Sequence, residues 1–219
     1  MALETIYDTP NGKHVISIDQ WERPAIQRLF EESRRVQALD STLEGRRILS
    51  GWLKGFRMVG IFYEASTRTS TSFAQGARAL GADIENITGV QFSSVSKGET
   101  LEDTVRALNS YSDLVVMRHP EKGALARAAT VSRTPIINAG DGIGEHPTQA
   151  LLDAYTIFRH RPIDGLRLTF VGDLKNGRTV HSLARLASKF SGVTLNYVSP
   201  EQLRMPPELI GQLAESGTV

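Results

Sequence analysis

Short apolar runs alternate with helical segments along this chain, and this alternation constrains the fold more than any other feature of the sequence. Four of the apolar runs are short enough to be buried strands, and stretches with helical spacing lie between them. The expected strands cover residues 57–62, 83–88, 114–117 and 135–138, and the expected helices lie near 70–80, 100–111 and 121–131. Because strands that alternate with helices form parallel sheets, the sequence predicts an α/β fold with helices covering a parallel sheet.

The same pattern continues toward both ends of the chain. An amphipathic helix is expected from a cap at Asp19 to about residue 39, and another begins at Pro147, since proline is favoured in a first helical turn. A second strand, helix and strand follow at residues 166–171, 179–190 and 193–198. We therefore place a domain boundary within 147–160, which gives a first domain at 1–150 and a second at 151–219. Only two strands are expected in the second before a Pro206-Pro207 segment, so we expect it to be incomplete.

Composition excludes several classes of function. The chain has no cysteine, which removes disulfides, thiolate metal sites and cysteine nucleophiles. The 25 Lys and Arg residues balance 24 Asp and Glu residues, so the net charge does not indicate a nucleic-acid or membrane surface. The first 13 residues lack the apolar core of a signal peptide, and no apolar run approaches the length of a membrane span. We expect a cytoplasmic protein that binds neither nucleic acid nor membrane.

The segment FYEASTRTSTSF, residues 62–73, carries the clearest functional pattern. It places the hydroxyls of Ser66, Thr67 and Thr69, together with the guanidinium of Arg68, where a helix begins after the first strand. Free backbone N–H groups and the helix dipole favour an anion at such a position, and an arginine adds a planar charged fork. The alternative is that these hydroxyls only cap the helix. The segment alone leaves both interpretations open.

Three other predicted strand ends carry polar groups, which matters because ligands of open parallel sheets collect beyond the carboxyl ends of the strands. The loop 89–98 contains Ser93 and Lys97, the third strand is followed by Arg118, and His146 precedes Pro147 after the fourth. Three of these residues also have an ordinary structural explanation. Lys97 could be a solvated loop lysine, Arg118 could pair with a neighbouring carboxylate, and His146 could cap the helix or pack in the core. No set of residues with metal-ligand spacing surrounds His146. Cations, hydroxyls and amides together suit a phosphorylated ligand that bears a carbonyl group.

Several common catalytic motifs are missing from the sequence. The loop 172–177 follows a predicted strand but does not match G-x-G-x-x-G, and the next strand ends without a ribose-binding acid, so a nicotinamide enzyme is not expected. Neither a Walker G-x-x-x-x-G-K-[ST] motif nor a G-x-S-x-G elbow occurs.

Five segments in order give the chain a family resemblance. These segments resemble the corresponding segments of aspartate carbamoyltransferases; in chain order they are FYEASTRTSTSF, SSVSKGETLEDT, VVMRHP, NAGDGIGEHPTQALLD and VGDLKNGRTVHSLA. The resemblance implies two parallel-sheet α/β domains of the carbamoyltransferase type, the second incomplete here. It also implies transfer of a carbamoyl group from carbamoyl phosphate to L-aspartate, an early step of pyrimidine biosynthesis, without a metal or cofactor.

The resemblance also implies roles for particular residues. Carbamoyl phosphate would be bound by Ser66, Thr67, Arg68, Thr69, Ser93, Lys97, Arg118, His146 and Gln149, with Ser93 and Lys97 supplied by an adjacent subunit of a homotrimer. Within this set, Gln149 would hold the carbamoyl amino group, and the catalytic groups would be Arg68, Thr69, Arg118 and His146. Lys97 and Arg178 would bind aspartate.

Two departures from the family pattern leave alternatives open. Position 70 is Ser70, where bacterial relatives commonly have arginine, and the chain ends before two later segments that complete the aspartate site in the family. One alternative is therefore a carbamoyl-phosphate-binding or structural subunit without turnover. Another is a carbamoyltransferase for a different amine, such as ornithine.

Overall fold

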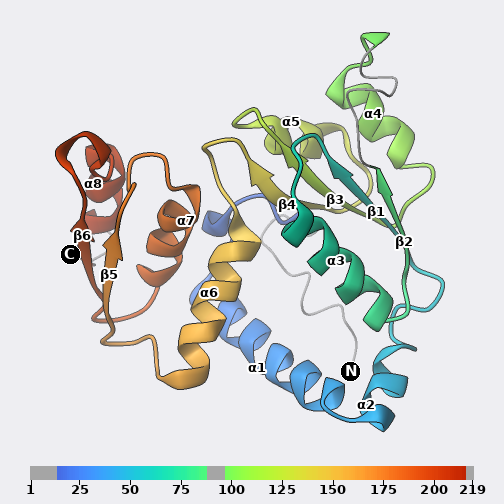
Figure 1. The fold of residues 1–219 in the computed structure, drawn as a ribbon, viewed down its shortest axis with the longest axis horizontal. Helices are drawn as coiled ribbons and strands as arrows, with labels where there is room; N and C mark the ends of the chain where they lie inside the picture. The colour runs from blue at the N-terminus through green and yellow to red at the C-terminus, as the bar shows by residue number, and fades with distance from the viewer. Residues whose placement is uncertain (1–13, 88–96, 216–219) are drawn as a thin grey trace.

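The computed structural model describes residues 14–87 and 97–215, which form two parallel sheets with helices around them. In chain order the elements are η2 (Ile18–Gln20), α1 (Arg23–Asp40), α2 (Leu43–Leu49), β1 (Arg57–Phe62), α3 (Thr67–Ala79), β2 (Asp83–Ile87), α4 (Leu101–Leu108), β3 (Leu114–His119), α5 (Ala124–Val131), β4 (Ile136–Asp141), α6 (Pro147–His160), β5 (Arg167–Val171), α7 (Arg178–Ala187), β6 (Thr194–Val198), η5 (Glu201–Leu203) and α8 (Pro207–Glu215). Figure 1 shows α6 between the four-stranded sheet and the smaller unit of β5 and β6.

The four-stranded sheet is parallel throughout and has the order β2-β1-β3-β4. Successive side chains of a strand point to opposite faces, and the cores follow this period. Val59 and Ile61 of β1 pack with α4 and α5, whereas Met58 and Phe62 belong to the core on the α3 face. The apolar runs of the sequence are therefore strands buried on both faces, as expected for a parallel sheet.

The strand order places a switch point at the centre of this sheet. The chain leaves β1 for β2 on one side, then returns through α4 to place β3 on the other side of β1. Ligands of open α/β sheets bind outside the carboxyl ends of the strands at such a point. The ends of β1 and β3, which carry Ser66 and Arg118, therefore define where a ligand is expected.

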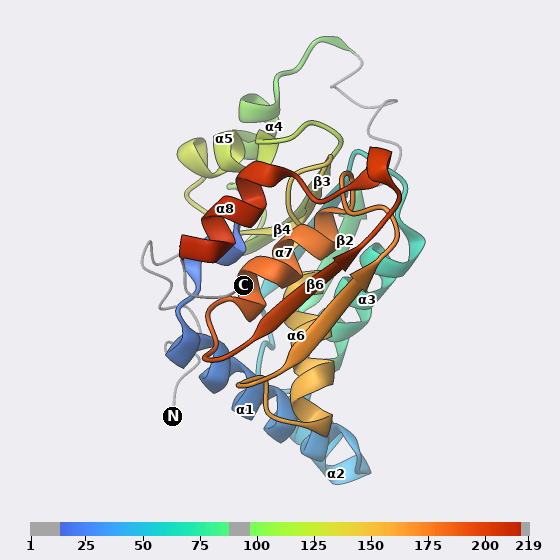
Figure 2. The same cartoon turned by 90° about the vertical axis from the view of Figure 1, so that its left-hand side faces the viewer.

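The second sheet consists of β5 and β6, which pair in parallel from Arg167 with Thr194 to Val171 with Val198. Figure 2 shows the two strands side by side, with α7 behind them. Their core contains apolar residues of α6, α7 and α8, and it also includes Ile26 and Phe30 of α1. Residues of α1 and α6 thus pack in the same hydrophobic core as the second sheet, so segments from both ends of the described chain share one core.

Most of the predicted elements are confirmed, with their ends shifted by a few residues. The strand 57–62 is reproduced without change, and the predicted strands 114–117 and 135–138 extend further along the sheet as β3 and β4. The α/β class predicted from alternation is correct. The helix predicted near 70–80 begins earlier, at Thr67, so Thr67, Arg68 and Thr69 form its first turn.

The predicted cap at Asp19 is wrong. Asp19 lies within the short η2 turn, which Ser17 caps, while α1 begins only at Arg23. Trp21 has an extended backbone between the two, and Pro24 occupies the first turn of α1. Proline supplies a preset φ and needs no hydrogen-bond acceptor there, so the helix starts with Pro24 in its first turn.

Two short helices were missed at the sequence level. The Thr42 side chain accepts a hydrogen bond from the Gly45 N–H at the start of α2, and Glu44 lies in its first turn, which together form a helix-start signal. Pro207, for which no helix was predicted, is the first residue of α8. No helix in the described part of the chain is long and apolar enough to cross a membrane.

Candidate functional site

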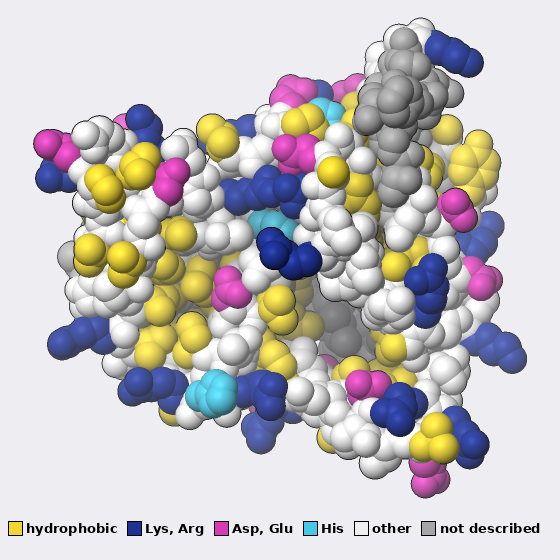
Figure 3. Space-filling model, viewed as in Figure 1, with side chains coloured by type: hydrophobic (Ala, Val, Ile, Leu, Met, Phe, Trp, Pro, Cys, Tyr) yellow, Lys and Arg dark blue, Asp and Glu magenta, His cyan; other side chains and the backbone are white. Residues whose placement is uncertain are grey.

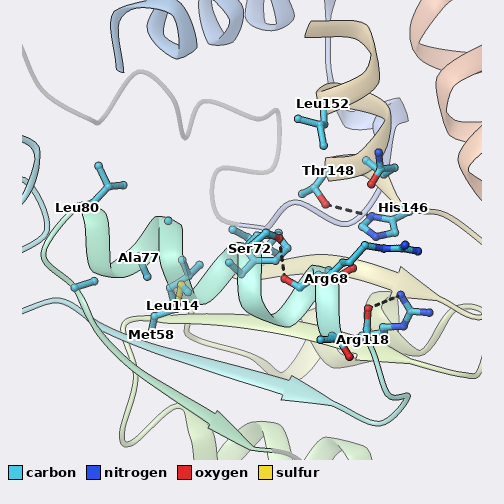
Figure 4. A pocket seen from close by; sticks show the side chains of 18 of the residues that line it. Met58, Arg68, Ser72, Ala77, Leu80, Leu114, Arg118, His146, Thr148 and Leu152 are labelled. Atoms are coloured by element: carbon cyan, nitrogen blue, oxygen red, sulfur yellow. Dashed lines mark hydrogen bonds between the residues drawn. The ribbon is translucent and has the colours of Figure 1, made fainter. Parts of the chain in front are cut away.

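A cavity of about 1390 Å³ opens where the β1 and β3 ends meet α6 and α7. Its charged end is formed by Arg68, Arg118, His146 and Arg178, and its other end is lined by apolar residues of the α3 face. Figure 4 shows Arg68, Arg118 and His146 at one end and Met58, Ala77, Leu80 and Leu114 toward the other. In Figure 3, basic side chains gather beside a histidine next to a hollow in this face of the molecule.

The first turn of α3 offers several unused donors to the cavity. Ser66 occupies the N-cap position, but its side chain makes no capping hydrogen bond. Arg118 Nη1 instead donates to Ser66 Oγ at 3.4 Å, a long contact. The first N–H groups of a helix have no acceptor within the helix, so Thr67, Arg68 and Thr69 present main-chain donors as well as side chains. The alternative that the Ser66 hydroxyl only caps α3 is therefore wrong, and the anion-site interpretation gains support.

Arg68 and Ser70 differ in how they relate to this turn. Arg68 is exposed, lines the cavity and forms no ion pair within residues 14–87 and 97–215. The Ser70 hydroxyl donates to the Ser66 carbonyl oxygen at 2.7 Å, so it is held against the helix backbone. At this turn Arg68 is therefore the cation available to a ligand, and Ser70 contributes to the helix start.

Arg118 is held in place by a carboxylate that the sequence analysis did not single out. Its Nε donates to Glu64 Oε2 at 3.0 Å, and its side chain retains only 15% exposure. Glu64 Oε2 also lies 3.9 Å from Arg178 Nη1. Both sequence alternatives for Arg118, a carboxylate partner and a place in a ligand cavity, are therefore realised together. Glu64 lies two residues before Ser66, but no sequence motif marks it as a partner of Arg118.

His146 is buried, with 6% exposure, at the N-terminus of α6. Its side chain makes no capping bond to the helix; instead its Nδ1 lies 3.2 Å from Thr148 Oγ1. Burial, followed by the positive charges of Arg178 and Arg118, lowers the pKa of His146 from 6.5 to about 4. At neutral pH the ring is therefore uncharged, with one nitrogen protonated as a donor.

Arg178 connects the smaller unit to the loop before His146. It is the first residue of α7, and its Nη1 donates to the Gly142 carbonyl oxygen at 2.5 Å. Gly140, with φ of +117°, lies so close to this guanidinium that a Cβ would press against it. Burial and the charge of Arg118 lower the pKa of Arg178. The close approach of backbone and guanidinium thus explains a glycine at 140.

The remaining predicted site residues are divided between the cavity and its surroundings. Gln149 lines the cavity, and its Nε2 donates to Asp153 Oδ1 at 2.8 Å. Lys97 is exposed and is not among the cavity-lining residues. Ser93 lies outside the described residues. The turn after Lys97 does form the predicted helix start, since Thr100 Oγ1 accepts from the Asp103 N–H at 3.1 Å.

No group of three or more His, Asp or Glu side chains that could hold a metal ion occurs within 14–87 and 97–215. The candidate site therefore consists of guanidinium groups, hydroxyls, a neutral imidazole, an amide and a helix N-terminus. Such a set binds anions and stabilises negative charge that develops on an oxygen.

Fold and site together define an α/β protein with a cavity lined by guanidinium groups, hydroxyls and an imidazole at the switch point of a parallel sheet. Residues 13–159 match the sequence profile of the family described as aspartate/ornithine carbamoyltransferase, carbamoyl-P binding domain. The chain belongs to this family, which confirms the resemblance noted in the sequence.

Individual relatives are similar over nearly the whole chain. The aspartate carbamoyltransferase catalytic subunit of Dichelobacter nodosus is 44% identical over 211 residues, which cover 94% of this chain and 60% of that protein. The multifunctional protein pyr1-3 of Dictyostelium discoideum is 47% identical over 207 residues, 94% of this chain and 9% of that protein. The fold is similar to aspartate transcarbamoylase from Trypanosoma cruzi in complex with carbamoyl phosphate and aspartate, with a TM-score of 0.88, 40% identity, and coverage of 95% of this chain and 65% of that one. The chain spans about 60% of the length of the single-function catalytic subunits that it matches.

Proposed function

We propose that this chain binds carbamoyl phosphate in the cavity and transfers its carbamoyl group to the amino group of L-aspartate. The products are N-carbamoyl-L-aspartate and phosphate, in an early step of pyrimidine biosynthesis that we assign to the cytoplasm. The observation that carries the proposal is the meeting of the α3 N-terminus, Arg118 and His146 in one cavity at the switch point. Relatives bound to both substrates support it.

The phosphate group is assigned to the first turn of α3. Its oxygens would accept from the N–H groups and hydroxyls of Ser66, Thr67 and Thr69, and from the guanidinium of Arg68. Arg68 is suited to this role because it has no competing ion pair among the described residues. The leaving group would therefore be bound as an anion throughout the reaction.

The carbonyl oxygen of the carbamoyl group is assigned to Thr69, Arg118 and His146. Attack by the aspartate amine forms a C–N bond and a tetrahedral oxyanion. The C–O bond to phosphate then breaks as the oxyanion collapses, and the departing phosphate takes up the proton that the amine nitrogen loses. Donors fixed before the reaction stabilise that charge without reorganising. A neutral His146 fits this task, since the protonated nitrogen donates while the ring adds no charge to a site that already contains three arginines.

The aspartate side of the site is assigned to Arg178 and Lys97. Arg178 faces the same cavity and would bind a carboxylate of aspartate. Lys97 and Ser93 are assigned to the cavity of an adjacent subunit in a homotrimer, which accords with the exposed position of Lys97 outside the cavity of its own chain.

Calorimetric titration of the 219-residue chain with carbamoyl phosphate and with inorganic phosphate tests the binding half of the proposal. Arg68→Ala should weaken binding of both by about tenfold or more, because it removes a charged hydrogen-bond donor. Arg78→Ala, at the exposed opposite end of α3, is the matched control and should leave both affinities unchanged. If the unmodified chain binds neither anion, the proposal is wrong.

A product assay with aspartate and ornithine tests the catalytic half. Carbamoyl aspartate should form in the presence of aspartate, and His146→Ala should lower the rate by about 100-fold, as for loss of one oxyanion donor. Binding without product would assign the chain a binding role alone. Product formed only with ornithine would assign it a different acceptor.

A further inference from the structure

Asp153 and Gln149 form a pair along one side of α6 that faces the cavity. They are four residues apart, so they lie one above the other on the same face of the helix. The Gln149 Nε2 donates to Asp153 Oδ1 at 2.8 Å, and both side chains line the cavity. Asp153 forms no ion pair with any Lys, Arg or His of the described residues, so its contact with Gln149 is not part of a salt-bridge network.

A carboxylate and an amide can pair in only one way. An ionised carboxylate accepts hydrogen bonds but cannot donate them, whereas an amide has a donating NH₂ end and an accepting oxygen end. Asp153 therefore fixes which end of the Gln149 amide is turned toward it. The NH₂ end is held by Asp153, and Oε1 remains free to accept a hydrogen bond from another donor.

We propose that Asp153 is a positioning residue that orients Gln149 Oε1 to accept from the amino group of a bound carbamoyl group. Carbamoyl phosphate and acetyl phosphate are nearly isosteric, and they differ in that the first has NH₂ where the second has CH₃. An acceptor held at this position binds the first and is left unpaired by the second. A site built to pair a ligand polar group rejects the analogue that lacks it. Asp153 would thus set selectivity for the carbamoyl group, an assignment that rests on the proposed function.

The location of Asp153 supports this role over a purely structural one. Burial raises the pKa of Asp153, so the carboxylate is placed there at an energetic cost. The next side chain on the same face, one turn beyond, is the partly buried apolar Ile157. An apolar residue at 153 would avoid the cost of burying a carboxylate, but it would leave the Gln149 amide free to rotate.

The experiment compares three ligands with the 219-residue chain and its variants: carbamoyl phosphate, acetyl phosphate and inorganic phosphate. Asp153→Ala should weaken binding of carbamoyl phosphate by about tenfold, the loss of one hydrogen bond, and leave the other two affinities unchanged. Asp153→Asn retains an accepting oxygen, so it should stay within about threefold of the unmodified chain. Thr156→Ala, on the exposed face of α6, is the control and should change none of the three. Circular dichroism would establish that each variant is folded.

A double-mutant cycle separates positioning from direct contact. If Asp153 acts through Gln149, then Gln149→Ala and the double variant Gln149→Ala with Asp153→Ala should bind carbamoyl phosphate equally weakly. Additive losses would overturn the inference, because Asp153 would then contact the ligand independently. Three other results would also overturn it. Asp153→Ala could lose affinity equally for all three ligands, or lose affinity for none of them. Asp153→Asn could lose as much affinity for carbamoyl phosphate as Asp153→Ala does. Failure of the unmodified chain to bind any of the three would refute the proposed function itself.

Discussion

His146 should make the chain less stable as the pH falls below 6.5. In the folded chain its pKa is lowered to about 4 by burial and by the charges of Arg178 and Arg118, whereas an unfolded histidine titrates near 6.5. The unfolded chain therefore binds the proton more tightly than the folded chain. The contribution of neutral His146 to stability is complete above pH 6.5 and is lost as the pH falls from 6.5 through 4.

The size of this loss follows from the two pKa values. The separation between 6.5 and about 4 corresponds to a limiting loss of about 3 kcal/mol, at about 1.4 kcal/mol for each pH unit. Linkage gives about 2 kcal/mol of that loss by pH 5 and most of the remainder by pH 4. The side chain is 6% exposed, so solvent screening reduces this figure little. A typical domain is stable by only about 5–15 kcal/mol, so the effect is measurable.

Urea unfolding at a series of pH values from 7.5 to 4, with His146→Asn for comparison, measures this contribution. Asparagine does not titrate, and its amide can still pair with Thr148. The difference in unfolding free energy between the two proteins should change by about 2 kcal/mol between pH 7.5 and pH 5, with the unmodified chain losing more. Parallel pH profiles for the two proteins, or an NMR titration of His146 with a midpoint near 6.5, would refute the assignment.

Three further changes give separate tests. Arg118→Met should weaken binding of carbamoyl phosphate by about tenfold or more in calorimetry, because it removes a charged donor to the carbonyl oxygen, whereas Arg127→Met, whose ion pairs are exposed, should not. Equal affinities for the two variants would remove Arg118 from the carbamoyl-phosphate site. Gly81→Ala should lower the unfolding free energy by about 3 kcal/mol, because φ is +88° and an added Cβ would meet a carbonyl oxygen. Gly55→Ala is the control: its φ is +81° but the space around it is open, so it should lower the unfolding free energy by about 1 kcal/mol. Similar values for the two variants in urea unfolding would contradict the steric argument. Thr42→Ala should cost about 1 kcal/mol in the same assay by removing the cap of α2, and no change would show that the cap contributes nothing.

The fold was largely predictable because buried parallel strands give a strong local signal. The run 57–62 contains five apolar or glycine residues after Arg57, and β1 occupies just that run. Helix starts were predictable where a single residue determines them, as Pro147 does for α6. The start of α1 was not, because Asp19 and Pro24 are both helix-start signals and only the extended Trp21 between them decides which one applies. Whether Asp19 begins a helix thus depends on tertiary packing, since Ile18 and Trp21 belong to the core.

The charged part of the candidate site shows the same division between local and tertiary information. Ser66, Arg68, Arg118 and His146 could be singled out from the sequence because each lies at or after the end of a strand, and strand ends of a parallel sheet converge. Glu64 could not be assigned a role in this way. Its contact with Arg118 depends on the pairing of β1 with β3, and its contact with Arg178 depends on the approach of α7 to the β1 end; no local pattern encodes either contact.

These contacts explain how two guanidinium groups remain close together in a partly buried cavity. Unpaired charges removed from water are costly, and two like charges repel. Glu64 lies 3.0 Å from one guanidinium and 3.9 Å from the other, so a single carboxylate offsets part of both charges. His146 lies near the same two arginines and stays neutral, first because it is buried and then because their positive charges disfavour protonation of the ring. Glu64 therefore offsets part of the charge of both arginines, while burial, together with those charges, keeps His146 in the uncharged state in which it can act as a donor.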